Sequence, residues 1–181
     1  MASWVCSSAT GGSPWDDWPV PEPSGKSEAE PAAAMRARVR ASFRRQVMMT
    51  TLGAELVSVE RGRVELAIPY DARFTQQHGF LHAGAVAAVL DSACGYAAFS
   101  VMPPEAAVLT ATYSINLLAP AAGERFVMTG TVVRAGRTLV VCRGEAVASG
   151  AGAPAAAGEA APFAVMQATL TALYDRPGIR H

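Results

Sequence analysis

The feature that most limits how this chain can fold is a long run of small and apolar residues, Phe80–Met102, interrupted by one acidic side chain, Asp91. A run of this length raises the possibility of a membrane-spanning helix. Asp91, Ser92, Gly95 and many alanines lower its hydropathy, and strand-like segments flank it closely. A helix that is apolar on every side is also typical of the buried centre of a folded domain. We therefore predict a central core helix and no membrane span.

The chain has 181 residues and a formal net charge of zero, which suits one globular domain with a proper core. A balanced charge argues against a general nucleic-acid or membrane-surface binder. The cysteines, Cys6, Cys94 and Cys142, have no metal-ligand spacing and read as free thiols in a reducing compartment. The N-terminal segment lacks the basic and apolar regions of a signal peptide. We therefore expect a cytoplasmic protein with no metal site.

The N-terminal part of the chain divides into a tail and a helix. Residues 1–30 are rich in Gly, Ser and Pro and are predicted to be a flexible tail, whose three tryptophans form either a loosely docked arm or a partner-binding motif. The domain is predicted over residues 31–181. Residues 32–49 are predicted to be helical, because apolar residues recur every four positions at Met35, Val39, Phe43 and Val47. The arginines on its other faces form either a solvated surface or an attractor for an anionic ligand.

Most of the remaining sequence is typical of strands. A hairpin is predicted from Val57 to Ile68, with its turn at Arg61-Gly62. Four further strands are predicted over residues 107–118, 124–134, 138–148 and 165–174, with a low-complexity loop over residues 149–162. Consecutive strands joined by short turns indicate an antiparallel sheet, so the fold class is α+β. Because the long helix is apolar all round, the sheet must curl around it, or a second subunit must cover its open side.

The long helix has one side paved with small residues. Since each helical residue advances by about 100°, Asp91 shares its side with Gly84, Ala87, Ala88, Cys94, Gly95 and Ala98. The bulkier stripe consists of Val86, Val89, Ala93 and Tyr96, and we expect this stripe to pack on the sheet. The small-residue side leaves room for another helix or a thin ligand chain.

Asp91 has two interpretations. A carboxylate in such apolar surroundings is costly unless it is hydrogen-bonded or paired, and the predicted helix carries no Lys or Arg. Asp91 is therefore either a structural residue that bonds a neighbouring loop, or a carboxylate retained as a nucleophile or general base. His82 precedes it by nine residues, which would place the two on opposite sides of one helix, so they are not expected to form a dyad within one chain.

The entry to the helix is rich in hydrogen-bond donors. The first N–H groups of a helix lack partners within it and suit a developing oxyanion. Gln76 or Gln77 can hold a carbonyl or a water through its amide. His78 and His82 either position the loop or act in catalysis directly. A donor pocket together with a carboxylate is the equipment needed to hydrolyse an acyl group.

These residues resemble a known motif. The segment QQHGFLHAGAVAAVLDSACGYAA is similar to the helix motif of PaaI-like hotdog-fold acyl-CoA thioesterases, with an amide residue, a short loop, His-Ala-Gly, and an Asp nine positions after the His. LTATYSINLLAPA resembles the next strand of that family, with Asn116 and Pro120, and RAGRTLVVCRGEAV its following turn and strand. The resemblance extends over residues 53–174.

The resemblance implies a hotdog fold, in which an antiparallel sheet wraps a long central helix, and edge-to-edge homodimers that often pair into tetramers. It implies active sites shared across the dimer, with acyl-CoA as substrate and no cofactor apart from the coenzyme A that it carries. Asp91 would activate water or attack the thioester carbonyl, and the backbone N–H of Ala83, with or without Gly84, would form the oxyanion hole. The remaining implied roles are water or carbonyl orientation by Gln76, loop support by His82, a hydroxyl near Asp91 from Thr110, and coenzyme A binding by Arg134 and Arg137.

The sequence differs from the family pattern at two positions, and it allows two other functions. The family often has Asn at the position of Gln76 and Gly at that of Ala83. The same fold hosts hydratases and dehydratases, which would need a His of one subunit to meet Asp91 of another. A non-catalytic acyl-CoA-binding protein is the third possibility.

Overall fold

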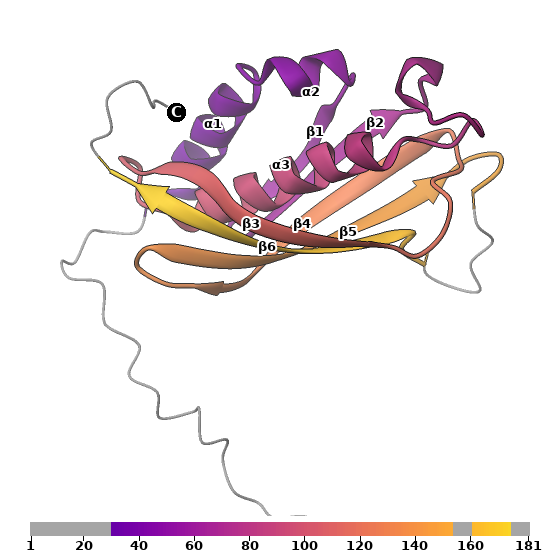
Figure 1. Ribbon diagram of the computed structural model, residues 1–181. Helices are drawn as coiled ribbons and strands as arrows, with labels where there is room; N and C mark the ends of the chain where they lie inside the picture. Colours follow the sequence, from indigo (N-terminus) through magenta and orange to yellow (C-terminus); the bar gives the residue numbers. More distant parts are fainter. Residues whose placement is uncertain (1–29, 154–160, 175–181) are drawn as a thin grey trace, which may run out of the picture.

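The computed structural model of the chain describes residues 30–153 and 161–174. A long helix lies along one face of a curved sheet, and two shorter helices lie on the same side (Figure 1). The helices are α1 (Ala32–Phe43), α2 (Val47–Thr51) and α3 (Ala83–Val101), with a 3-10 turn at Ala72–Phe74. The strands are β1 (Glu55–Glu60), β2 (Arg63–Pro69), β3 (Ala107–Leu117), β4 (Arg125–Ala135), β5 (Leu139–Ser149) and β6 (Ala164–Leu173). The predicted tail up to residue 29, with its tryptophans and Cys6, lies outside the described residues, as do residues 154–160 of the predicted loop.

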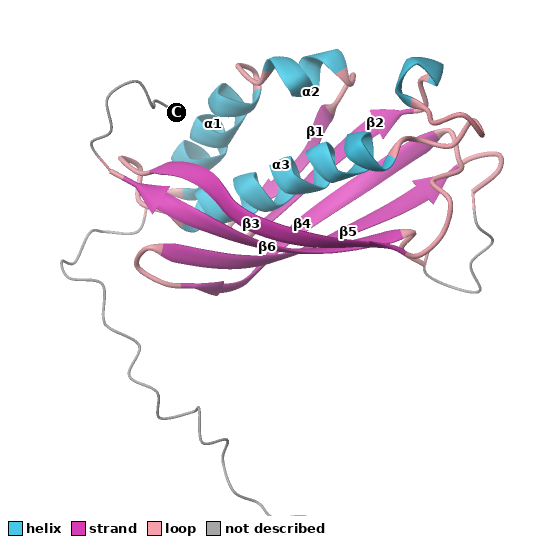
Figure 2. Cartoon of the chain, viewed as in Figure 1, coloured by secondary structure: helices cyan, strands magenta, loops and turns pink. Residues whose placement is uncertain are grey.

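The sheet has six strands in the order β1-β2-β4-β5-β6-β3, and every neighbouring pair is antiparallel (Figure 2). The predicted hairpin and the four later strands are all present, with ends within about two residues of the prediction. The α+β prediction of an antiparallel sheet wrapped around a central helix is confirmed. The order places β3 at one edge of the sheet, beside β6.

Helix α3 forms the centre of the core. Val86, Val89, Leu90 and Phe99 are fully buried in it, and the helix packs against all the strands of the sheet. Among the described residues, α3 is the one helix long and apolar enough to cross a membrane, yet most of it is buried inside the domain. The apolar run is therefore the core helix that the sequence predicts.

The predicted division of α3 into a small side and a bulky side is wrong at two positions. Cys94 and Ala98 are fully buried, although the helical periodicity places them on the side of Asp91. The reason lies in the sheet, because Gly130 in β4 and Gly144 in β5 are paired directly beneath the helix. A Cβ atom on Gly130 would lie 2.4 Å from the backbone of Ala93, so these glycines let the helix sink onto the sheet.

We expect Gly130→Ala to destabilise the fold, because the added methyl would meet helix backbone that cannot rotate away. Overpacking of this kind costs about 1–3 kcal/mol, and chemical denaturation should measure it as a lower free energy of unfolding. Gly95→Ala is the matched control, since nothing lies within 4 Å of its added Cβ. Equal stability of the Gly130→Ala variant and the parent would contradict the proposed close approach.

The N-terminal helix differs from its prediction. The expected single helix over residues 32–49 breaks after Phe43, and α2 begins at Val47. Met35 and Val39 are buried as predicted, whereas Val47 is 77% exposed because the break turns it away from the stripe. In the same way, a register shift between Leu56 and Ser58 in β1 leaves Val57 exposed, against the predicted alternation.

Arg38 fixes α1 to the end of α3. Its guanidinium pairs with Glu30 at 2.7 Å and donates hydrogen bonds to the carbonyl oxygens of Phe99 and Met102, at 3.3 Å and 3.2 Å. A cation at a helix C-terminus satisfies carbonyls that have no partner in the helix and complements the helix dipole. This anchor places the α1–α2 corner, residues 44–46, over the middle of α3, where Gln46 bonds Ser92.

Candidate active site

The N-terminus of α3 presents one backbone donor. His82 is the N-cap, and its Nδ1 atom accepts a hydrogen bond from the Gly84 N–H at 2.9 Å. The His82 N–H itself donates to the carbonyl of Phe74, also at 2.9 Å. The N–H of Ala83, between these two, makes no hydrogen bond to any described residue. Ala83, rather than Gly84, therefore has the N–H that is open to a ligand.

The loop before α3 holds Gln76 beside this donor. The Gln76 N–H donates to the Phe80 carbonyl at 2.9 Å, and the loop turns at Gly79, whose φ of 83° suits glycine. The side-chain Oε1 of Gln76 accepts a hydrogen bond from the His78 N–H. The amide NH₂ of Gln76 is thus the part of its side chain that remains for a ligand. Gln77 and His78 are exposed.

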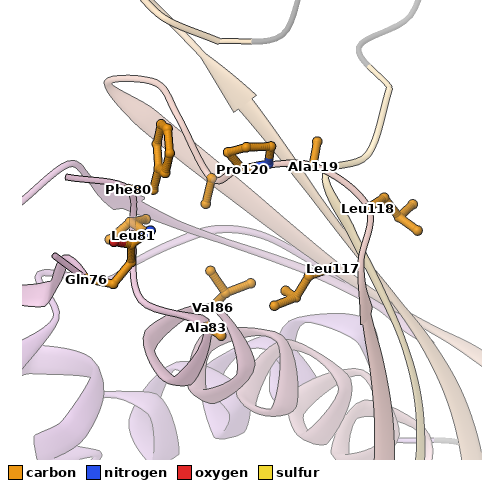
Figure 3. Close-up of a pocket in the computed structure, with 10 residues that line it drawn as sticks. Gln76, Phe80, Leu81, Ala83, Val86, Leu117, Leu118, Ala119 and Pro120 are labelled. Atoms are coloured by element: carbon orange, nitrogen blue, oxygen red, sulfur yellow. The ribbon is translucent and has the colours of Figure 1, made fainter. Parts of the chain in front are cut away.

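Gln76 and Ala83 line the same cavity, of about 500 Å³. Figure 3 shows the start of α3, with Ala83 and Val86, on one side of this cavity and Leu117, at the end of β3, on the other. Phe80 and Pro120 lie beyond them, so most of the wall is apolar. The cavity therefore offers polar donors at one point of an otherwise apolar surface, as ligand sites commonly do.

Asp91 lies half-buried near the middle of α3. Burial raises the pKa of its carboxyl group above the ordinary range, and a hydrogen bond from Thr110 opposes that rise. The Thr110 Oγ1 donates to Asp91 Oδ1 at 2.7 Å. A register shift between Thr110 and Thr112 in β3 occurs at this point. A carboxylate with a raised pKa and one held oxygen is suited to accept a proton from water or to attack a carbonyl.

Asp91 and Thr110 line a second cavity, of about 450 Å³, whose far wall the sequence did not predict. That wall consists of Ser42, at the end of α1, and of Arg45 and Gln46 in the α1–α2 corner. The apolar periodicity of residues 32–49 indicated one continuous helix and therefore gave no reason to place these side chains near Asp91. The break in the helix became apparent only when α1 and α2 packed on α3.

The two halves of the predicted site lie apart within one protomer. No residue lines both cavities. Ala83 and Asp91 are eight residues apart in one helix, which corresponds to about 12 Å along its axis. One carbonyl carbon cannot contact both the Ala83 N–H and the Asp91 carboxylate across that span. Within one protomer, therefore, the two groups do not meet at a single carbonyl.

Arg134 and Arg137 lie at the β4–β5 turn and are exposed. They line neither cavity, and no carboxylate among the described residues pairs with them. The turn is near the C-terminal end of α3. The Val132 N–H donates a hydrogen bond to the Gly62 carbonyl, and the Gly62 N–H donates one to the Ser100 hydroxyl. Within the part of the chain that the structure describes, His, Cys, Asp and Glu form no group of three or more that could hold a metal ion.

Comparison with protein families gives one match over the centre of the chain. The model of the thioesterase superfamily matches residues 78–155, which include the His-Ala-Gly entry and Asp91. Two proteins described as candidate esterases are also similar. One, from Saccharolobus solfataricus, is 34% identical over 90 residues, and the other, from Halobacterium salinarum, is 32% identical over 99 residues. The matches cover 50% and 52% of this chain but only 64% and 65% of those proteins, slightly less than two thirds.

Solved structures extend the similarity to most of the chain. A thioesterase family protein from Silicibacter pomeroyi is 54% identical, with a TM-score of 0.72, and the match covers 77% of this chain and 98% of that one. The PaaI protein from the phenylacetic acid degradation operon of E. coli is 19% identical, with a TM-score of 0.66 over 77% of this chain and 93% of its own. The second likeness concerns the fold alone.

Proposed function

The chain belongs to the thioesterase superfamily and has its hotdog fold, and on this premise we propose that it hydrolyses an acyl-CoA thioester to a free carboxylic acid and coenzyme A. The observation that carries the proposal is the pair of complementary half-sites on α3. One supplies a half-buried carboxylate, Asp91, held by Thr110, and the other supplies the Ala83 N–H beside the Gln76 amide. Joined, they contain a base or nucleophile and an oxyanion donor.

The edge strand β3 supports the proposal that the two half-sites are joined in a homodimer. It is 11 residues long, and among the described residues only β6 pairs with it. Edge strands of monomeric proteins are usually short, charged or covered, whereas β3 contains no charged residue and no proline. It leaves Leu109, Tyr113 and Leu117 about half exposed. We propose that two copies pair antiparallel along this edge, either as a dimer or within a tetramer.

The register of such a pairing brings the half-sites together. If the two-fold axis passes near Tyr113 and Ser114, Thr110 of one copy lies opposite Leu117 of the other. Thr110 lines the Asp91 cavity, and Leu117 lines the Ala83 cavity. Each dimer would therefore have two equal sites, each with Asp91 from one subunit and Ala83 from its partner.

The chemistry follows from these groups. Asp91 either removes a proton from water as the water attacks the thioester carbonyl, or attacks that carbonyl itself to form an anhydride that water then opens. In both cases the carbonyl oxygen becomes negative and accepts a hydrogen bond from the Ala83 N–H. The C–S bond breaks, coenzyme A leaves as a thiolate that takes up a proton, and water supplies the oxygen of the new carboxylate. The Gln76 amide orients the water or the carbonyl.

The proposal assigns coenzyme A to the substrate and calls for no separate cofactor. Arg134 and Arg137 are the proposed contacts of its nucleotide end, because they are exposed cations without a carboxylate partner among the described residues. His82 supports the site by capping α3 through Gly84. We propose that the protein acts in the cytoplasm, where acyl-CoA substrates are available.

A heterodimer of two inactive variants tests the shared site. In a two-fold dimer, an Asp91→Asn subunit paired with an Ala83→Pro subunit carries both changes at one site and neither at the other. The heterodimer, purified with two affinity tags, should regain about half of the activity of the unchanged dimer. An inactive heterodimer of normal thermal stability would show instead that each site lies within one chain.

A panel of acyl-CoAs distinguishes this function from the two others that the sequence allows. We expect release of free thiol, without a change in enoyl absorbance. A hydratase would change enoyl absorbance without thiol release. A binding protein would show only a thermal shift with the acyl-CoA, and no thiol release would then appear.

A further inference from the structure

The cavity beside Asp91 has a polar end formed by the α1–α2 corner. Arg45 and Gln46 lie on this corner and line the cavity together with Tyr96 of α3. The opposite wall, Val108 and Leu109 of β3, is apolar. An alkyl chain gains nothing from a cation at its far end, so the corner requires a separate explanation.

Charge is divided between the two ends of this cavity. Of the residues that line it, Asp91 is the one acid and Arg45 the one base. No carboxylate among the described residues pairs with the Arg45 guanidinium. Burial raises the pKa of Tyr96, while the Ser42 hydrogen bond and the charge of Arg45 oppose that rise. The charge of Arg45 therefore affects the pKa of Tyr96 in the cavity wall. The pKa of Asp91 depends instead on burial and on the hydrogen bond from Thr110.

Gln46 adds directional donors at the same end. Its Oε1 atom accepts a hydrogen bond from Ser92 Oγ at 3.2 Å, which fixes the orientation of the side chain. The amide NH₂ of Gln46 is thereby left to donate. A cation next to an amide donor is suited to bind an anionic oxygen group, because charge-assisted hydrogen bonds are the stronger ones.

Asp91 and Arg45 line one cavity of about 450 Å³. Gly95 follows Asp91 by one helical turn, about 6 Å along the axis, and has no side chain to block the path. The pantetheine arm of coenzyme A, with its two amides, is much longer than that span. We therefore assign the acyl group, rather than the pantetheine arm, to the space between Asp91 and Arg45.

We infer that the preferred substrates are ω-carboxyacyl-CoAs, the monothioesters of dicarboxylic acids, with Arg45 and Gln46 binding the free carboxylate at the far end of the acyl group. The inference rests on the proposed thioesterase function and adds its substrate class. It assigns a role to two residues of the α1–α2 corner that the thioester chemistry itself does not use.

The test compares matched thioesters with the full-length protein. Thiol release gives kcat/KM for adipoyl-CoA and hexanoyl-CoA, which differ only in the terminal carboxylate. We expect the unchanged protein to prefer adipoyl-CoA, and Arg45→Met to lower the adipoyl-to-hexanoyl ratio at least about tenfold, as loss of a charge-assisted contact predicts. Arg45→Lys should restore part of the ratio. Arg44→Met is the control, because Arg44 is the neighbouring cation, is equally exposed and does not line the cavity.

The possible results separate the inference from its premise. A fall in kcat/KM for both substrates by the same factor would assign Arg45 to coenzyme A and overturn the inference. So would a preference of the unchanged protein for hexanoyl-CoA. If neither substrate nor any other thioester is hydrolysed by the folded protein, the proposed function fails, and the inferred substrate class fails with it.

Discussion

We expect Asp91→Asn to abolish thioester hydrolysis, with kcat/KM at least about a thousandfold lower, because the variant lacks the general base or nucleophile. Asn has the same shape and can still accept the hydrogen bond from Thr110 that Asp91 accepts at 2.7 Å. The variant therefore changes the chemistry of the group and leaves its packing intact. Initial rates of thiol release on a panel of acyl-CoAs measure the loss.

The thermal stability of the same variant distinguishes a catalytic Asp91 from a structural one. Burial raises the pKa of Asp91 in the folded state, so its stabilising contribution is present below the unfolded pKa and is lost as the pH rises through the folded value. At neutral pH the ionised carboxylate destabilises the fold. Asp91→Asn should then melt at the same temperature as the parent or higher at pH 7. A marked fall in melting temperature would indicate a structural role.

The pH dependence of the unchanged protein provides a related check. If the ionised form of Asp91 is the active one, kcat/KM falls as the pH decreases through the pKa of its carboxyl group. Because burial raises that pKa, the fall should begin at a higher pH than for an ordinary aspartate. Activity that remains constant to the lower limit of protein stability would contradict the assignment.

Ala83→Pro should lower kcat by about 10²–10³-fold, because it removes one oxyanion donor. Ala83 is the first residue of α3, a position where proline is well tolerated. The preceding residue, His82, has φ of −65° and ψ of 137°, an extended conformation that a following proline favours. The substitution therefore deletes the N–H and leaves the helix in place. Steady-state kinetics should show the loss in kcat.

Ala83→Gly is the control for this variant. It removes the methyl group, retains the N–H, and should keep most of the activity. Circular dichroism and thermal melting of both variants verify that α3 is intact. Full activity of a correctly folded Ala83→Pro variant would move the oxyanion donor elsewhere, and the Gln76 amide would be the first group to test, since it lines the same cavity.

The elements and the motif could be predicted from the sequence because their signals are local. The apolar run at Phe80–Met102, the alternation in the strands and the turn at Arg61-Gly62 each depend on neighbours along the chain. The break at residues 44–46 could not be predicted, because the stripe from Met35 to Val47 fits one continuous helix. Contacts with α3, such as the bond from Ser92 to Gln46, are long-range and have no local signal.

By itself, the sequence determined the helix that forms the core, the succession of strands along the chain and the residues that the resemblance assigns to the site. The tertiary structure alone decided how these are combined. Gly130 and Gly144 bring the sheet so close to α3 that Cys94 and Ala98 are buried. The rise of the helix keeps Ala83 and Asp91 in separate cavities, and Arg45 reaches the Asp91 cavity from a distant part of the chain. Periodicity specifies which face of an element is apolar, but only packing specifies what covers that face and how near it comes.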